Sequence, residues 1–253
     1  MATAERDLMG GLAKGLSVIE TFNADRPRQS ISEVAAAAGL DRATARRCLL
    51  TLAHHGYADY DGKFFTLTPR VLRLGTACLA AMPLPQLVQP LLDRLSDEIG
   101  ESSSVSILDG AEIVYVARAA QRKVMSIALM PGSRLPAYCT SMGRVLLAAL
   151  PEAEARLRLG TGPLPRRTPF TLTDPDAIHA ELAQVRAAGY AVIDQEVELG
   201  LRSIAVPLVS ARGTAVAALN LGLPARPEPI ADLPARYLPA LRGVQAQLRD
   251  ILR

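Results

Sequence analysis

The sequence predicts an α+β protein of two domains that are joined by a helix. Residues 29–67 contain, in order, a short helix, a tight turn, a basic second helix and a hairpin. Pro83 and Pro85 then mark a boundary, and from about Leu84 helices alternate with strands that short turns connect. Strands joined by hairpins favour an antiparallel sheet covered by helices over a doubly wound parallel sheet.

Two consecutive short helices are predicted by their capping residues. The first begins at Ser30, whose hydroxyl can cap the backbone N–H groups while Glu33 completes a capping box. It ends at Gly39, a residue suited to the left-handed conformation of a sharp turn. Asp41 is the expected N-cap of the second helix. Apolar residues recur in that helix at helical spacing and are expected to form one buried stripe: Ala45, Cys48, Leu49 and Leu52.

A hairpin is predicted after Gly56, with residues 57–60 and 63–67 as its strands. Asp61-Gly62 between them is a pair that readily supplies the positive φ values of a two-residue type I′ turn. Lys63 would then lie on the hairpin, at the position of a wing. With a further amphipathic helix at residues 12–22, this order of parts is the layout of a winged helix-turn-helix.

In a winged helix-turn-helix the N-terminal half of the second helix enters the major groove of DNA. Arginine can pair bidentately with guanine there, and a threonine can contact a base or a phosphate. We therefore expect six residues to contact double-stranded operator DNA: Arg42, Ala43, Thr44, Arg46, Arg47 and Lys63.

Net charge alone does not indicate a nucleic-acid partner. Residues 1–75 hold 10 Lys and Arg against 8 Asp and Glu, a difference of +2. Three arginines on one helix are usually a solvated face, and a pure protein-interaction module would also fit if the basic helix were incidental. The order of helix, turn, basic helix and hairpin is what favours DNA binding. Any binding should be sensitive to salt, because it would rest on a few charges placed at phosphates.

Composition fits a soluble globular chain, with 49% hydrophobic and 21% charged residues in a length of 253. No stretch approaches the roughly 18 uninterrupted apolar residues of a membrane span, and the polar start lacks the order of a signal peptide. We therefore expect a cytoplasmic protein without a membrane partner. Cys48, Cys78 and Cys139 are odd in number and widely spaced, which favours buried, reduced thiols over disulfides or a metal site.

The second half of the chain is expected to hold most of the sheet. Thr68-Pro69 ends the hairpin, and a connecting helix follows from Val71 to Met82. The elements expected beyond it are helices at 87–99, from Asp174-Pro175 to Gly189 and at 234–252, and strands at 102–108, 112–118, 124–129, 190–194, 203–209 and 215–222.

An enzyme is the rival class, and the sequence offers Cys139 and three histidines as potential nucleophile and bases. However, it contains no Gly-x-Ser-x-Gly elbow, no His-Glu-x-x-His, no phosphate-binding Gly-x-x-x-x-Gly-Lys-Ser/Thr loop and no Gly-x-Gly-x-x-Gly fingerprint. His54 and His55 fall at the end of the basic helix, and His179 lies in an ordinary amphipathic helix. We therefore expect no catalysis, no cofactor and no bound metal.

Three stretches resemble motifs of the IclR family of bacterial transcriptional regulators, and the resemblance covers nearly the whole chain. They are Lys14-Gly15-Leu16 with the Gly39-Leu40 turn, residues 138–144 (Tyr-Cys-Thr-Ser-Met-Gly-Arg) and residues 200–205 (Gly-Leu-Arg-Ser-Ile-Ala). Residues 101–106, residues 67–72, Arg46-Arg47 and residues 194–196 also resemble the subgroup that regulates the β-ketoadipate pathway. That subgroup responds to protocatechuate, 4-hydroxybenzoate or related acids.

The resemblance implies a division of the chain into three parts. Residues 1–68 would be a winged helix-turn-helix DNA-binding domain, residues 69–84 a linker helix used in dimerisation, and residues 85–253 an effector-binding domain with a sheet similar to GAF and profilin-like folds. A homodimer or a dimer of dimers is implied. The resemblance also implies that the protein activates genes for aromatic acid catabolism, with protocatechuate, 4-hydroxybenzoate or β-ketoadipate as its effector. Contact with RNA polymerase is an additional expectation.

Two alternatives remain open at this point. One is a repressor of the same family that senses a different small organic acid, and the other is an enzyme acting on a small carboxylic acid. Asn220 followed by Gly222 departs from the Ser-x-Ser of glyoxylate-responsive relatives, which disfavours a small keto acid.

The resemblance also implies an effector pocket where the loop 138–141 meets residues of the later strands: Tyr138, Thr140, Ser141, Asp194, Glu196, Ser203 and Asn220. A carboxylate needs N–H or hydroxyl donors, and an aromatic ring needs an apolar wall. Thr140, Ser141 and Ser203 could supply the donors; Met125, Leu129 and Met142 could supply the wall.

Simpler interpretations of these residues also stand. Thr140 and Ser141 would then only cap the helix that begins near Met142, and the methionines would be core residues. Arg144 and Arg202 are ambiguous, because each could tie the sheet to its neighbours through carboxylates such as Asp194 or Glu198.

Overall fold

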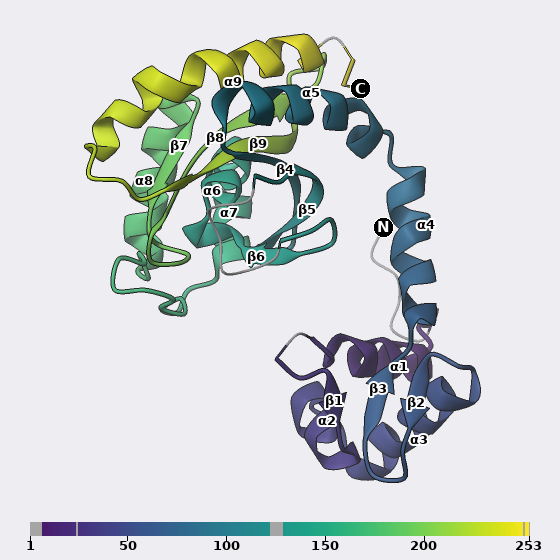
Figure 1. The fold of residues 1–253 in the computed structure, drawn as a ribbon. Helices are drawn as coiled ribbons and strands as arrows, with labels where there is room; N and C mark the ends of the chain where they lie inside the picture. The colour runs from purple at the N-terminus through teal and green to yellow at the C-terminus, as the bar shows by residue number, and fades with distance from the viewer. Residues whose placement is uncertain (1–6, 24, 122–128, 250, 253) are drawn as a thin grey trace. The chain divides into compact units, whose positions relative to one another are not determined.

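The computed structural model describes residues 7–23, 25–121, 129–249 and 251–252. The chain divides into two compact units, Met1–Ala81 and Met82–Arg253, and each is described by itself (Figure 1).

The first unit packs helices against a small antiparallel sheet of strand order β1-β3-β2. Its elements are α1 (Gly10–Glu20), β1 (Arg28–Gln29), α2 (Ile31–Ala38), α3 (Arg42–His54), β2 (Ala58–Tyr60), β3 (Phe65–Leu67), the short 3-10 helix η2 (Pro69–Val71) and α4 (Leu72–Ala81). Val18, Val34, Leu49 and Phe65 are fully buried at its centre. The core thus joins α1, α2, α3 and β3.

The caps that the sequence predicts for α2 and α3 are confirmed. Ser30 and Glu33 form both bonds of the capping box, and Gly39 ends α2 in the left-handed conformation with φ of 64°. Asp41 caps α3 by accepting a hydrogen bond of 2.8 Å from the backbone N–H of Thr44. In the predicted apolar stripe of α3, Ala45 and Leu49 are fully buried and the other two members are half-buried against the same core.

The predicted type I′ turn is wrong. Only four residues, 61–64, separate the paired Tyr60 and Phe65, and Asp61 does not have the positive φ that such a turn requires. The Asp61 carboxylate instead accepts hydrogen bonds from the backbone N–H groups of Lys63 and Phe64. An aspartate that caps its own loop in this way stabilises a longer turn than the dipeptide rule predicts.

The second unit has a six-stranded antiparallel sheet of order β6-β5-β4-β9-β8-β7. Its elements are α5 (Pro83–Ile99), β4 (Ser102–Asp109), β5 (Glu112–Ala119), β6 (Arg134–Pro136), η3 (Ala137–Cys139), α6 (Ser141–Ala149), α7 (Glu152–Leu159), α8 (Pro175–Ala188), β7 (Ala191–Asp194), β8 (Leu201–Val209), β9 (Ala215–Pro224), η4 (Ile230–Asp232) and α9 (Leu233–Arg249).

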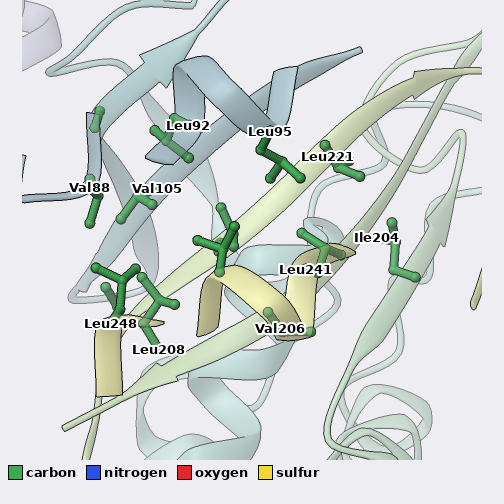
Figure 2. Packing of buried hydrophobic residues seen from close by; sticks show 14 of the residues in the cluster. Val88, Leu92, Leu95, Val105, Ile204, Val206, Leu208, Leu221, Leu241 and Leu248 are labelled. Carbon is green, nitrogen blue, oxygen red and sulfur yellow. The ribbon is translucent and has the colours of Figure 1, made fainter. Parts of the chain in front are cut away.

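Helices cover both faces of this sheet, with α5 and α9 on one face and α6 and α8 on the other (Figure 1). Figure 2 shows part of the first layer, where Leu92 of α5, Leu241 of α9 and Val206 of β8 belong to one buried hydrophobic cluster. The second layer is built around Met142, Leu147 and Ile178. Residues of a strand alternate between the two faces, so every second position of β4, β8 and β9 is directed toward α6.

Some predicted elements differ from the structure. The helix expected from residue 87 begins earlier, at Pro83, because proline is well tolerated in a first helical turn. The short strand β6 and helix α7 have too few residues to give a periodic signal and were not predicted. The expected strand at 124–129 falls almost entirely outside the described residues. Cys78 is exposed on α4, in contrast to the buried thiol that we expected.

Candidate DNA-binding and effector-binding sites

The exposed face of α3 carries most of the side chains predicted to contact DNA. Arg42, Ala43, Arg46 and Arg47 are all exposed, and α3 is held from behind by its buried Leu49. Thr44 is half-buried and, with Arg47, borders a cavity of about 460 Å³ between α1 and α3. The structure therefore gathers the predicted arginines on one face but turns Thr44 partly toward α1.

The hairpin loop adds a second basic position. Lys63 is exposed there, and its Nζ lies 5.1 Å from the centre of the Phe64 ring. The guanidinium of Arg28 lies over the same ring at 4.1 Å and also forms an ion pair of 2.5 Å with Asp61. Sequence reasoning missed Arg28, because a strand of two residues has no periodicity and its partner is 33 positions away.

In the second unit, the N-terminus of α6 is fixed by unusually close packing against η3. The Thr140 hydroxyl caps the helix by accepting a hydrogen bond from the N–H of Gly143, and it donates to the carbonyl of Pro136. Gly143 lies against η3 so closely that a Cβ at this position would come 2.2 Å from the carbonyl oxygen of Ala137. Only glycine allows this approach.

A row of polar side chains crosses the sheet on the face that α6 covers. Arg118 of β5 lies opposite Ser104 of β4, and Ser104 lies opposite Asn220 of β9. The next residue in the row is Ala205 of β8. Beside this row Ser102, Gly222 and Ser203 are aligned in the same way. Three central strands of a buried face therefore carry polar residues, in contrast to the apolar face under α5 and α9.

Two buried polar atoms, one on α6 and one on the face of the sheet that α6 covers, have no hydrogen-bond partner among the described residues. They are Oγ of Ser141, at the first position of α6, and Oδ1 of Asn220, and both residues are at least nine-tenths buried. Buried polar atoms are nearly always paired in proteins, so each exception is a position where strain, an ordered water or a ligand is expected. The capping role that the sequence left open thus belongs to Thr140, and the Ser141 hydroxyl is not used for it.

The apolar wall beside these atoms contains two of the three predicted residues. Met142 is 1% exposed, and its sulfur lies 3.1 Å from the hydroxyl of Ser106. Leu129 is half-buried against the same cluster. Met125 lies outside the described residues.

The structure does not bring Asp194 to this face. Asp194 pairs with Arg202 across the neighbouring strands, and their side chains form an ion pair of 2.8 Å on the opposite face from Ser203. The same Arg202 donates to the carbonyls of Arg226 and Glu228. Because successive side chains of a strand alternate, residues 202 and 203 cannot serve one site on a single face. Asp194 and Arg202 are therefore structural partners, as one of the two interpretations of Arg202 expects.

The Glu196 carboxylate also has hydrogen-bond partners within the protein. Its Oε2 accepts hydrogen bonds from Nη2 of Arg144 at 2.7 Å and from the N–H of Leu172 at 3.0 Å. Burial raises the pKa of the Glu196 carboxyl, while Arg144 acts in the opposite direction. Asp194 and Glu196 border a different depression, of about 700 Å³, between α8, β7 and the segment around η4.

The loop before α6 is anchored rather than open. The hydroxyl of Tyr138 donates to the carbonyl of Pro165, and Arg144 Nε donates to the carbonyl of Tyr138 at 3.0 Å. Burial raises the pKa of the Cys139 thiol to about 11, so that thiol is protonated at neutral pH and is not an activated nucleophile. Tyr138 therefore positions the loop, and the candidate site consists of the residues that remain beside the sheet.

Neither a membrane span nor a metal cluster is found in the part of the chain that the structure describes. No single helix there is long and apolar enough to cross a membrane, and the segments 69–78 and 83–99 reach that composition only as a pair bent by 90°. No group of three or more His, Cys, Asp or Glu side chains is placed to hold a metal ion among those residues.

Two family models match this chain. The IclR helix-turn-helix domain matches residues 11–62, and the C-terminal domain of the bacterial transcriptional regulator IclR matches residues 76–235.

Individual proteins are similar along almost the whole length. The Pca regulon regulatory protein of Pseudomonas putida is 44% identical over 247 residues, which cover 97% of this chain and 85% of that protein. The p-hydroxybenzoate hydroxylase transcriptional activator of Acinetobacter baylyi is 38% identical, over 97% of this chain and 93% of that protein.

A solved structure with a bound ligand is also similar. An IclR homologue from Microbacterium hydrocarbonoxydans, crystallised with 4-hydroxybenzoate, has a TM-score of 0.75 and 29% identity over 95% of this chain and 98% of its own. The similar proteins are regulators rather than enzymes. The chain therefore belongs to the IclR family and is a ligand-responsive, DNA-binding transcriptional regulator.

Proposed function

We propose that this regulator activates genes for the catabolism of an aromatic acid through the β-ketoadipate pathway. Its effector would be 4-hydroxybenzoate, protocatechuate or β-ketoadipate. The similarity to regulators of the pca regulon and of p-hydroxybenzoate hydroxylase supports this pathway, as does the ligand of the similar crystal structure.

The observation that carries the proposal is the pair of unpaired, buried polar atoms on Ser141 and Asn220 beside the Met142 wall. A ligand with polar groups and a flat apolar body would pair these atoms and cover the wall at once. Ser203 lies diagonally next to Asn220 on the same face and is 8% exposed. We place the effector between these three residues, with Leu129 as a further apolar contact.

Operator binding is assigned to the exposed face of α3 and to the loop of the hairpin. Arg42, Arg46 and Arg47 would enter the major groove with Ala43 toward the bases, and Lys63 and Arg28 would lie at the phosphate backbone. A homodimer or dimer of dimers would present two such faces to a two-part operator, and α4 would contribute to dimerisation. The effector changes promoter occupancy or contact with RNA polymerase only if it binds two states of the protein with different affinity.

The test is thermal unfolding of the purified protein with a panel of protocatechuate, 4-hydroxybenzoate, β-ketoadipate, glyoxylate and pyruvate. A ligand at ~100 times its dissociation constant stabilises the folded state by about 2.7 kcal/mol. A rise in Tm with one of the first three compounds is the expected result. A rise with glyoxylate or pyruvate alone would replace the aromatic pathway with the alternative of a family member that senses another organic acid.

A further inference from the structure

Arg118 stands out on the effector face because it is a partly buried arginine without an acidic partner among the residues that the structure describes. Its Nη1 donates a hydrogen bond of 3.0 Å to the hydroxyl of Ser104, which is itself 1% exposed. Arginine has five N–H donors, and this bond uses one of them. Burial lowers the pKa of the Arg118 guanidinium.

Other buried arginines of this unit are paired. Arg144 and Arg202 lie 2.7 and 2.8 Å from the carboxylates of Glu196 and Asp194. Among the described residues no acidic side chain forms such a pair with Arg118. The sequence of residues 122–128, Arg-Lys-Val-Met-Ser-Ile-Ala, also contains no aspartate or glutamate.

The position of Arg118 connects it to the proposed effector site. It begins the row that continues through Ser104 to Asn220, whose Oδ1 has no partner. Adjacent strands lie about 4.8 Å apart. Because β4 lies between the strands of Arg118 and Asn220, the backbones of these two residues are roughly 10 Å apart. The Arg118 side chain extends to the Ser104 hydroxyl, on the strand that lies between Arg118 and Asn220.

We propose that Arg118, together with the Ser104 hydroxyl, binds the carboxylate of the effector, while Asn220 and Ser141 bind the polar group at its opposite end. This inference rests on the proposed function and deepens it, since it makes Arg118 the residue that selects acids. It also reverses the orientation expected from the sequence, in which Ser141 and its neighbours hold the carboxylate. The Ser104 hydroxyl accepts from Arg118, and because its own proton has no acceptor among the described residues, it can donate to the ligand. A guanidinium can hold a carboxylate in a bidentate pair, which fixes the plane of the ligand.

The inference is tested by calorimetric titration of the full-length protein with acids and with matched neutral compounds. The probes are 4-hydroxybenzoate and protocatechuate, each compared with the corresponding benzyl alcohol. The variants are Arg118→Gln, Arg118→Lys and, as a control, Arg212→Gln, which removes the same charge from an exposed turn of the same unit. The wild-type protein should prefer the acid.

Arg118→Gln should weaken binding of the acid by about 30-fold or more and leave binding of the alcohol unchanged, because only the acid loses a charged partner. Arg118→Lys should give a smaller loss, and Arg212→Gln should have no effect. If the glutamine variant does not fold, the lysine variant supplies the same comparison of acid with alcohol.

An unchanged ratio of acid to alcohol affinity in both Arg118 variants would overturn this inference and leave the proposed function intact. An equal loss of affinity for the acid and the alcohol, in a variant with normal thermal unfolding, would also overturn it. Arg118 would then shape the site rather than bind the carboxylate. Failure of the wild-type protein to bind either acid would overturn the proposed effector class and this inference together.

Discussion

Gly143→Ala is expected to destabilise the second unit, although alanine normally favours a helix. In a helix interior this replacement gains about 1 kcal/mol from propensity alone. Opposing it, the new Cβ would lie 2.2 Å from the carbonyl oxygen of Ala137 and 2.3 Å from its Cα. These are backbone atoms of a fully buried residue, so no side-chain rotation can relieve the contact.

The steric cost should exceed the gain in helix propensity. To reach an ordinary contact, α6 and η3 would have to separate by about 1 Å, and overpacking of this kind costs about 1–3 kcal/mol and occasionally more. A contact with buried backbone belongs at the upper end of that range, so a net loss of roughly 2 kcal/mol is expected. For a domain of this size that corresponds to a fall in Tm of about 4–8 °C.

Urea denaturation followed by far-UV circular dichroism, together with thermal unfolding, measures this loss. Gly243→Ala is the matched control, because Gly243 lies in the interior of α9 with no atom within 4 Å of its would-be Cβ. That variant should gain stability. If Gly143→Ala were as stable as the wild-type protein, or gained as much as Gly243→Ala, the close packing of α6 on η3 would be refuted.

Three further predictions concern the two sites and the buried ion pair. Arg47→Ala should weaken specific operator binding by about 5-fold to 150-fold in an electrophoretic mobility shift assay, the range of one lost bidentate base contact of about 1–3 kcal/mol. Ser203→Leu should weaken effector binding in calorimetry without changing operator affinity of the ligand-free protein, because the larger side chain occupies the proposed site. Glu196→Ala should lower the free energy of unfolding by about 3–5 kcal/mol, since it leaves the charge of Arg144 buried without its closest partner.

Each of these predictions has its own control. For the operator, Arg73→Ala removes an equal charge from α4, and equal losses in both variants would contradict a specific role for the α3 face. For the effector, an unchanged titration curve would remove Ser203 from the site. For the ion pair, a denaturation midpoint equal to that of the wild-type protein would show that Glu181, 3.9 Å from Arg144, fully replaces the lost carboxylate.

Local signals in the sequence were sufficient for the elements on which the DNA-binding assignment rests. Ser30, Glu33, Gly39 and Asp41 act within four residues of the backbone groups they cap, so their effect can be read without the fold. The same holds for Asp174 and Gly189 at the ends of α8. The turn at Asp61 was misjudged because the dipeptide rule does not account for the Asp61 carboxylate, which accepts hydrogen bonds from the N–H groups of Lys63 and Phe64 and so stabilises a longer loop.

Only some of the residues predicted for the effector site are brought together by the structure. Ser203 and Asn220 do lie on one face of the sheet, but Arg118 was not expected there and Asp194 lies on the other side of the sheet. The alternation of side chains along a strand predicts which residues share a face of the sheet, but it does not predict which face α6 covers. A bulge in β5 opposite Val105 and Ser106 further shifts the register that places Arg118 opposite Ser104.

The sequence by itself determined the two-part α+β organisation, the capped helices with a basic exposed face and the family, because all of these depend on contacts within a few residues or on motifs that remain contiguous. The tertiary structure decided which polar groups are paired and which are not. Thr140 uses its hydroxyl to cap α6, Glu196 is taken by Arg144, and the polar atoms of Ser141 and Asn220 remain without partners among the described residues. Hydrogen bonds between distant segments exist only after strand order and register are set. The sequence therefore predicted the polar residues of the candidate effector site, and the packing of α6 on the sheet decided which of them are paired.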